Sequence, residues 1–219
     1  MCFILVFTLA LCSIVYELVL GQMLAALNGN TISQYSIVIG LYIANLGLGA
    51  LTVGLIDPRD SAKGLFKIEI ALTVLGGLSP FILLFLKSLT TESSMLLYFM
   101  ICLVGFLSGM EIPLVSSWFK ESNQKKSHSF ILGADYFGSV FGCVIFPFIF
   151  LPQIGLFLTA LFMGALNLVV AIFMLNSTST FSKKNLLGLG FVLVSFITIA
   201  IYLDDISGYF VGRAFSWQS

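Results

Sequence analysis

The 219-residue chain is 59% hydrophobic and only 9% charged, with a mean hydropathy of +1.09, whereas an ordinary soluble domain is about 25% charged. This composition excludes a soluble globular protein and predicts an all-α integral membrane protein in contact with the lipid bilayer. Ten Lys and Arg residues balance ten Asp and Glu residues, so the chain has no basic excess that would bind nucleic acid through its phosphates. The four cysteines lie in apolar stretches without CxxC spacing, and we therefore expect no metal site and no cofactor.

Seven apolar segments run along the chain, each close to the length of about 20 residues that crosses a bilayer. Turn residues and charged clusters separate them, and the shortest separator is a tight turn expected at 151–153. We therefore expect a single transmembrane domain over residues 1–219, built as a bundle of about seven helices. The expected spans are residues 3–27, 33–56, 65–87, 95–118, 130–150, 153–175 and 186–203.

Basic residues mark one side of this bundle. Eight of the ten Lys and Arg residues lie in the second, fourth and sixth connections, and two lie on the opposite side. The positive-inside rule then puts the N-terminus and these connections in the cytoplasm, so we expect a multi-pass protein of the cell membrane. A re-entrant segment around 147–152 is an alternative that would reverse the side of the C-terminus.

Three acidic residues are expected inside the hydrocarbon region: Glu17 in the first span, Glu111 in the fourth and Asp135 in the fifth. An ionisable group there costs about 2.5 to 3.5 kcal/mol on insertion scales, so an apolar chain is expected to keep one for a functional reason. The three acids predict a carboxylate-lined cavity that binds a cation or relays a proton. Tyr16 and Tyr136, which neighbour two of these acids in sequence, are the expected aromatic support of the site.

A structural alternative stays open for the same acids. They would be protonated, or paired with Lys67, Lys87 or Lys120, and would then only tie helices together. In the functional interpretation, Tyr42 and Trp118 are, like Tyr16 and Tyr136, close enough in sequence to supply a hydroxyl group or a cation–π face.

Small residues predict where the helices pack. Gly105 and Gly109, and likewise Gly138 and Gly142, are four positions apart and share a helix face, which lets two backbones approach closely within lipid. Pro113 and Pro147 interrupt the fourth and fifth spans, and each frees a backbone carbonyl group inside the membrane.

An internal repeat is a further expectation. Glu17 and Glu111 are separated in sequence by nearly the same interval as Gly40 and Gly133. Three-helix units at this interval would be inserted in opposite senses, as in the inverted repeats of secondary transporters. The bundle would then be a three-helix inverted repeat plus one helix, with coincidence as the alternative.

Five short stretches in order cover most of the chain and carry a family resemblance. They are residues 16–20 (YELVL), 40–49 (GLYIANLGLG), 109–114 (GMEIPL), 133–138 (GADYFG) and 151–156 (LPQIGL). Together they resemble the transmembrane domain of bacterial membrane-bound spermidine synthase-like proteins, which are polyamine aminopropyltransferase-like.

The resemblance implies a soluble aminopropyltransferase domain beside the membrane bundle, a Rossmann-like relative of methyltransferases that uses decarboxylated S-adenosylmethionine. The glycine-rich cofactor loop and the acidic residues that hold the amine substrate have no counterpart in these residues. We therefore assign no catalytic residue, and enzyme activity would depend on a domain or partner outside this chain. The implied partners are a soluble aminopropyltransferase-like domain or other membrane subunits, and the implied location is the bacterial cytoplasmic membrane. The family's membrane part is described as related to major-facilitator transporters, which would make this bundle half-major-facilitator-like.

These observations lead to one expected function and one alternative. The expected function is to bind or transport a small organic cation such as a polyamine, with Glu17 and Glu111 as ligands and Asp135 as a second ligand or gate. The alternative is a non-transporting membrane scaffold that assembles with a soluble synthase or a larger membrane complex.

Overall fold

A computed structural model of the chain describes residues 2–54, 61–89, 94–121 and 128–177, together with residues 196, 198 and 201. These residues form helices joined by short turns, and no strand occurs among them. The expectation of an all-α fold is therefore confirmed for the described part of the chain. The helices are α1 (Cys2–Asn28), α2 (Thr31–Val53), α3 (Ser61–Gly77), α4 (Ser79–Leu89), α5 (Ser94–Glu121), α6 (His128–Ile145), the π-helical turn η2 (Phe146–Phe150) and α7 (Leu151–Ser177).

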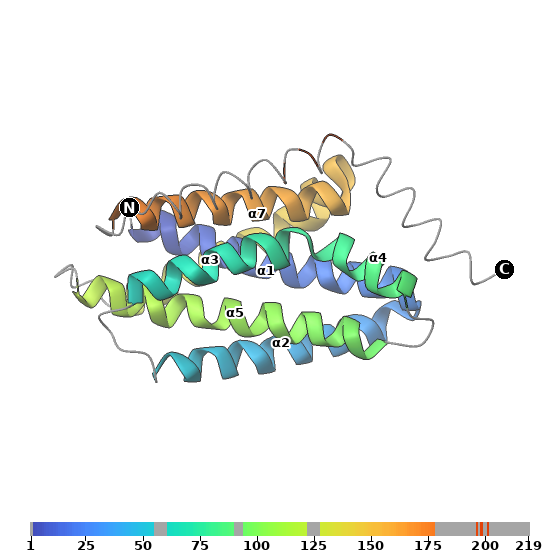
Figure 1. Cartoon of the computed structure of the whole chain (residues 1–219), viewed down its shortest axis with the longest axis horizontal. Helices are drawn as coiled ribbons and strands as arrows, with labels where there is room; N and C mark the ends of the chain where they lie inside the picture. Colours follow the sequence, from blue (N-terminus) through green and yellow to red (C-terminus); the bar gives the residue numbers. More distant parts are fainter. Residues whose placement is uncertain are drawn as a thin grey trace.

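α1 is the central helix of the bundle. Apolar residues surround its whole circumference, and most of them are buried against other helices, as expected of a helix that is hydrophobic on all sides. α2 buries only Val38, Tyr42, Gly49 and Val53 and exposes a wide apolar surface. Figure 1 shows α1 between the α7 side and the α2 side of the bundle. The exposed apolar surface of α2 suits a helix that faces lipid.

Close glycine contacts define the helix crossings. Gly105 and Gly109 lie on the backbone of α2, where an added Cβ atom would meet the carbonyl groups of Tyr42 and Leu46. Gly138 and Gly142 lie on α1 in the same way, against the regions of Phe7 and Leu11. Because glycine has no side chain, the backbones of α5 and α2 and of α6 and α1 approach closely at these positions.

The chain reverses direction between α6 and α7. Gly138 meets Phe7 and Gly142 meets Leu11, so α6 runs parallel to α1. The Cys12 thiol group donates to the carbonyl oxygen of Met163 at 3.8 Å, and residues 166–173 share a groove with residues 4–8, so α7 runs antiparallel to α1.

The reversal falls later than the turn expected at 151–153. The backbone stays helical through Phe146–Phe150 and Leu151, and it leaves the helix at Gly155, where φ is 76° and ψ is 176°. Only glycine adopts this conformation readily. Pro152 lies in the continuous helix before the break and has no N–H group to donate, and the π-helical turn ends directly before it, with the Leu151 N–H group donating to the carbonyl oxygen of Phe146.

The third expected span, residues 65–87, is broken into two helices. α3 and α4 meet at Leu78 with a bend of 53°. Pro80 has no N–H group to donate to the carbonyl oxygen of Gly76, four residues earlier. The Ser79 hydroxyl group donates to that oxygen instead, at 2.6 Å. The Ser79–Pro80 pair therefore accounts for the break.

Four described helical stretches are long and apolar enough to cross a membrane, or five if the bent pair counts as one span. One of the four, His128–Met174, has 47 residues and contains the reversal at Gly155. The seventh expected span, 186–203, lies largely outside the described residues, although the buried ring of Phe196 lies against Gly77 and Gly164. The seven-helix count and the three-helix repeat stay predictions.

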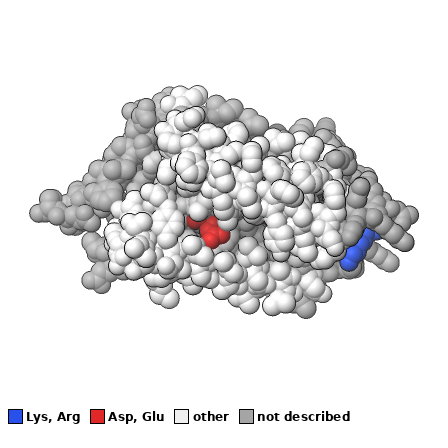
Figure 2. Space-filling model, turned by 180° about the vertical axis from the view of Figure 1, so that it is seen from behind, with Lys and Arg blue, Asp and Glu red and all other residues white. Residues whose placement is uncertain are grey.

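Three of the four described lysines lie at the ends of the bundle, and the fourth, Lys67, lies in the second turn of α3. Lys63 is near the start of α3 and Lys120 near the end of α5, which is the end where α6 begins. Lys87 lies at the opposite end and donates to Asn28 Oδ1 at 3.4 Å. The blue atoms in Figure 2 are at one end of the face shown there. By the positive-inside rule, the end that carries Lys63 and Lys120 is the expected cytoplasmic end.

Candidate functional site

An open cavity of about 350 Å³ lies between α1, α2, α5 and α6. Half of its described lining residues are polar or ionisable, although most of the lining surface is apolar, and no Lys or Arg residue occurs among them. The polar and ionisable lining residues are Ser13, Glu17, Tyr42, Ser108, Glu111, His128, Asp135 and Ser139.

All three acids expected in the membrane line this cavity. Glu17 comes from α1, Glu111 from α5 and Asp135 from α6. Glu17 is 8% exposed and Glu111 is 2% exposed, whereas Asp135 is half-buried. Figure 2 shows acidic atoms in a hollow near the middle of the bundle, surrounded by uncharged surface. Residues far apart in sequence thus form one acidic surface.

The three carboxyl groups are staggered along the bundle axis. Asp135 is one turn before Gly138, which packs on Phe7 and Ala10 of α1, so it lies at the level of the first turns of α1. Glu17 is about ten residues further along α1, which is roughly 15 Å at 1.5 Å per residue. Glu111 follows Ser108 on an antiparallel helix and lies between these two levels. The acids therefore line the length of the cavity and do not meet at a point.

Tyr42 joins three walls of the cavity. Its hydroxyl oxygen lies 3.0 Å from Ser108 Oγ and 3.0 Å from the carbonyl oxygen of Ser13, and 3.1 Å from Ser13 Oγ. Its side chain is fully buried. The sequence suggested Tyr42 only as a possible neighbour of the acids. In the structure its hydroxyl group links α1, α2 and α5.

Tyr16 and Tyr136, the expected aromatic support, do not line the cavity. Each precedes or follows an acid by one position, and successive helical residues point about 100° apart, so neighbours in sequence do not share a face. Tyr16 is fully buried and packs against Gly76 of α3. Tyr136 is 65% exposed on the outer surface of α6.

A fourth membrane acid, Glu69 of α3, was not singled out from the sequence. It is fully buried, and neither carboxyl oxygen has a hydrogen-bond partner within the described chain. It lies within the expected span 65–87, where the insertion cost that singled out the other three acids applies as well. The usable signal is helical spacing, because Leu65, Glu69 and Leu72 fall on one buried stripe of α3.

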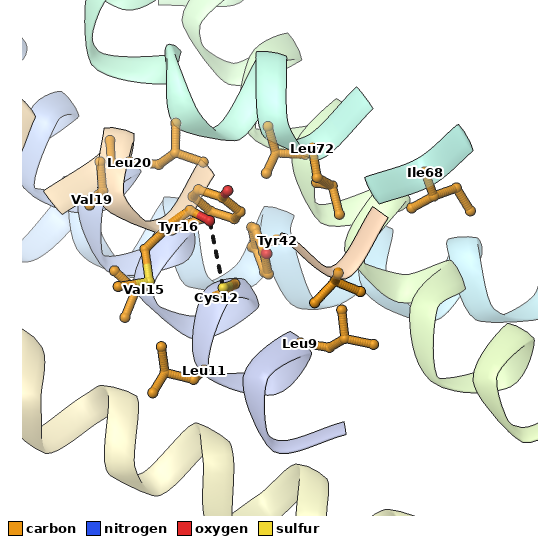
Figure 3. Packing of buried hydrophobic residues seen from close by; sticks show 14 of the residues in the cluster. Leu9, Leu11, Cys12, Val15, Tyr16, Val19, Leu20, Tyr42, Ile68 and Leu72 are labelled. Carbon is orange, nitrogen blue, oxygen red and sulfur yellow. Dashed lines mark hydrogen bonds between the residues drawn. The ribbon is translucent and has the colours of Figure 1, made fainter. Parts of the chain in front are cut away.

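The buried polar atoms without a partner lie in four residues of the described chain: Tyr16, Glu69, Glu111 and Asn167. We call these residues the inner polar centre. Figure 3 shows its surroundings, in which Cys12, Tyr16 and Tyr42 lie among packed leucines of α1 and α3. An unsatisfied buried polar group costs about 1 to 3 kcal/mol, so each of these residues is an unfavourable group that the bundle keeps in its interior.

The lysines named in the structural alternative do not reach the cavity. Lys67 and Lys120 are exposed, and Lys87 lies at the far end of the bundle beside Asn28. Among the described residues no group of three or more His, Cys, Asp or Glu side chains is arranged to hold a metal ion. The chemistry that the cavity offers is therefore attraction of a cation by spaced carboxyl groups and hydroxyl groups.

Comparison with known proteins identifies relatives that share one name. The polyamine aminopropyltransferase of Leptospira interrogans serogroup Icterohaemorrhagiae serovar copenhageni is 32% identical over 171 residues, covering 78% of this chain and 34% of that protein. Polyamine aminopropyltransferase 2 of Ralstonia nicotianae is 31% identical over 173 residues, covering 78% and 34%. The polyamine aminopropyltransferase of Mycobacterium tuberculosis is 34% identical over 182 residues, covering 76% and 34%.

The chain thus spans about a third of the length of the curated relatives it matches, as the 34% coverage states. No family model matches the chain, and no solved structure matches it. The expected relation to spermidine synthase-like proteins is supported by these relatives. The assignment of the matched part to their membrane domain stays a prediction.

Proposed function

We propose that the cavity binds a small organic cation of the polyamine class. The observation that carries this proposal is that Glu17, Glu111 and Asp135, from three different helices, line one cavity whose described lining has no Lys or Arg residue. A cleft of one charge sign with low-dielectric walls concentrates ions of the opposite sign. The relatives' name, polyamine aminopropyltransferase, supports the choice of a polyamine among organic cations.

The stagger of the carboxyl groups supports a linear ligand over a compact one. A single ammonium ion would meet one carboxyl group, whereas a chain with several ammonium groups can meet carboxyl groups spread over roughly 15 Å of helix. The methylene segments of such a ligand would lie against apolar lining residues such as Ile14, Leu46 and Leu132. Binding would therefore combine ion pairing with burial of apolar surface.

The proposed role is that of a membrane module that binds the cation and moves it toward the cytoplasmic end. The cavity lining extends to His128, the first residue of α6, at the end that carries Lys63 and Lys120. A cation bound at Glu17 would travel past Glu111 and Asp135 to reach that end.

A non-transporting scaffold is the second candidate, and one observation favours it. The chain covers 34% of the length of the relatives, so most of each relative lies outside the matched region. In this reading the helices anchor or assemble a soluble synthase, and the acidic cavity would have no ligand. A scaffold predicts that neutralising the cavity acids leaves partner assembly unchanged.

The test is the thermal stability of the purified protein in detergent during a spermidine titration. A ligand that binds only the folded state stabilises it by about 2.7 kcal/mol at 100 times its Kd. We expect a saturable rise in Tm for the parent, a much smaller rise at the same spermidine concentrations in Glu17→Gln and Glu111→Gln, and an unchanged rise in the control Tyr136→Phe. Salt at matched ionic strength provides the second control. A flat titration in the parent would favour the scaffold.

A further inference from the structure

Glu69 and Glu111 are two buried acids with different access to the cavity. Glu111 lines the cavity, yet its Oε1 atom is buried without a partner in the described chain. Glu69 is fully buried, does not line the cavity, and has no partner for either oxygen in the described chain. One acid can therefore meet a ligand and the other cannot.

The two acids lie at the same level of the bundle. The Leu114 side chain of α5 lies 3.4 Å from the position of a Cβ atom on Gly64 of α3, and the two helices run in opposite directions. Glu111, about one turn before Leu114, therefore lies close to the level of Glu69. A negative charge on either carboxyl group would repel a negative charge on the other, and the same holds for Glu111 and Asp135. Glu111 thus lies between the cavity and the interior.

The ionisable groups around Glu69 and Glu111 come from the helices packed against α3 and α5. Cys12 and Tyr16 on α1, Tyr42 on α2 and Asp135 on α6 lie within electrostatic reach of one or both acids, and Glu17 and His128 line the same cavity as Glu111. The described part of α7 has no titratable side chain. Lys63 and Lys67, on the same helix as Glu69, are exposed. The surroundings of the pair are therefore acidic or neutral.

Burial limits how a cation can enter such surroundings. A buried charge is costly unless it is paired, so adding an ammonium group to the interior is costly unless a negative charge appears with it. An acid that gives up its proton as the ammonium group arrives supplies that negative charge. The exchange leaves the total charge of the interior unchanged.

We propose that the cavity exchanges a cation for a proton at Glu111, while Glu69 keeps its proton throughout. With the cavity empty, both acids are neutral. When an ammonium group of the ligand reaches Glu111, the O–H bond of its carboxyl group breaks, the carboxylate pairs with the ammonium group, and the proton leaves through the cavity to solvent. Glu69 cannot be paired by the ligand, so its neutral carboxyl group forms the wall behind the site. This inference rests on the proposed function and adds its coupling to protons.

The first test counts protons by isothermal titration calorimetry of the purified protein with spermidine in two buffers of different ionisation enthalpy. We expect about one proton released per bound spermidine in the parent and in Glu69→Gln, whose amide replaces a neutral acid. Glu111→Gln should release none. Glu17→Gln should bind more weakly yet still release the proton. Binding by the parent without proton release would overturn the inference while leaving the proposed function standing.

The second test first measures the protonation of both acids in the ligand-free protein. Infrared spectroscopy detects the carbonyl stretch of a protonated carboxyl group, and the band of each acid is assigned by its loss in Glu69→Gln or Glu111→Gln. We expect both bands in the ligand-free protein, and we expect spermidine to remove only the Glu111 band. Absence of the Glu111 band from the ligand-free protein would overturn the proton exchange. Both bands present, with no effect of spermidine on them and no binding heat, would refute the proposed function instead.

Discussion

Gly109→Ala should open the contact between α2 and α5 and disturb the cavity beside it. An added Cβ atom on Gly109 would collide with the carbonyl oxygen of Leu46 and lie 2.7 Å from its carbonyl carbon, whereas ordinary carbon contacts are about 3.5 to 4.0 Å. The obstacle is backbone and cannot rotate away, so one helix must shift by roughly 1 Å. Gly109 and Leu46 both line the cavity, so the shift should reach the site.

The expected cost follows from overpacking, which destabilises by about 1 to 3 kcal/mol. For a chain of this size each kcal/mol lowers the Tm by about 2 to 4 °C, so a cost of about 2 kcal/mol corresponds to a loss of about 4 to 8 °C. Gly47→Ala is the matched control, because a Cβ atom there would meet nothing within 4 Å. Thermal unfolding of the two variants in the same detergent gives the comparison. Equal Tm values for Gly109→Ala and Gly47→Ala would refute this account of the crossing.

Three further variants test separate parts of the structure. Tyr42→Phe should lower stability by about 1 to 2 kcal/mol in denaturant titrations, because it removes the hydroxyl group that bridges three helices; an unchanged midpoint would contradict that bridging role. Ser79→Ala should cost about 1 kcal/mol in the parent and much less when combined with Pro80→Ala, since the alanine at position 80 restores an N–H donor; additive costs would count against the proposed cause of the bend. Asp135→Asn should weaken spermidine binding less than Glu111→Gln in calorimetry, because Asp135 is only half-buried; the reverse order would point to Asp135 as the principal ligand.

The elements of the fold that hydropathy could predict are the long ones. Residues 3–27, 33–56 and 95–118 agree closely with α1, α2 and α5, because a run of apolar residues of bilayer length needs a helix to satisfy its backbone. The break at Leu78 was not predicted, since residues 65–87 are apolar throughout and the bend depends on Ser79 and Pro80 at a particular carbonyl group. The reversal was expected at a Pro-containing turn and occurs at Gly155, where the backbone conformation decides.

In the candidate site, the sequence could predict the chemically important residues but not their neighbours in space. The cost of membrane insertion was enough to single out Glu17, Glu111 and Asp135, and these acids share one cavity. Adjacency in sequence did not predict which side chains line the cavity beside these acids. Successive helical residues point about 100° apart, so Tyr16 and Tyr136 face away from the acids next to them in sequence. Glu69 was not singled out although it lies in the expected span 65–87, and its burial depends on α5 and α7, which pack against α3 but lie far from it along the chain.

The most direct test of the central claim is equilibrium dialysis of labelled spermidine against the purified protein, the Glu111→Gln variant and the Tyr136→Phe control. We predict saturable binding to the parent and to Tyr136→Phe, competed by unlabelled spermidine more strongly than by a monoamine of the same length, and strongly weakened in Glu111→Gln. The preference for the polyamine follows from carboxyl groups staggered along the cavity. Equal binding by the parent and Glu111→Gln, or no saturable binding by the parent, would contradict a carboxylate-lined cation site.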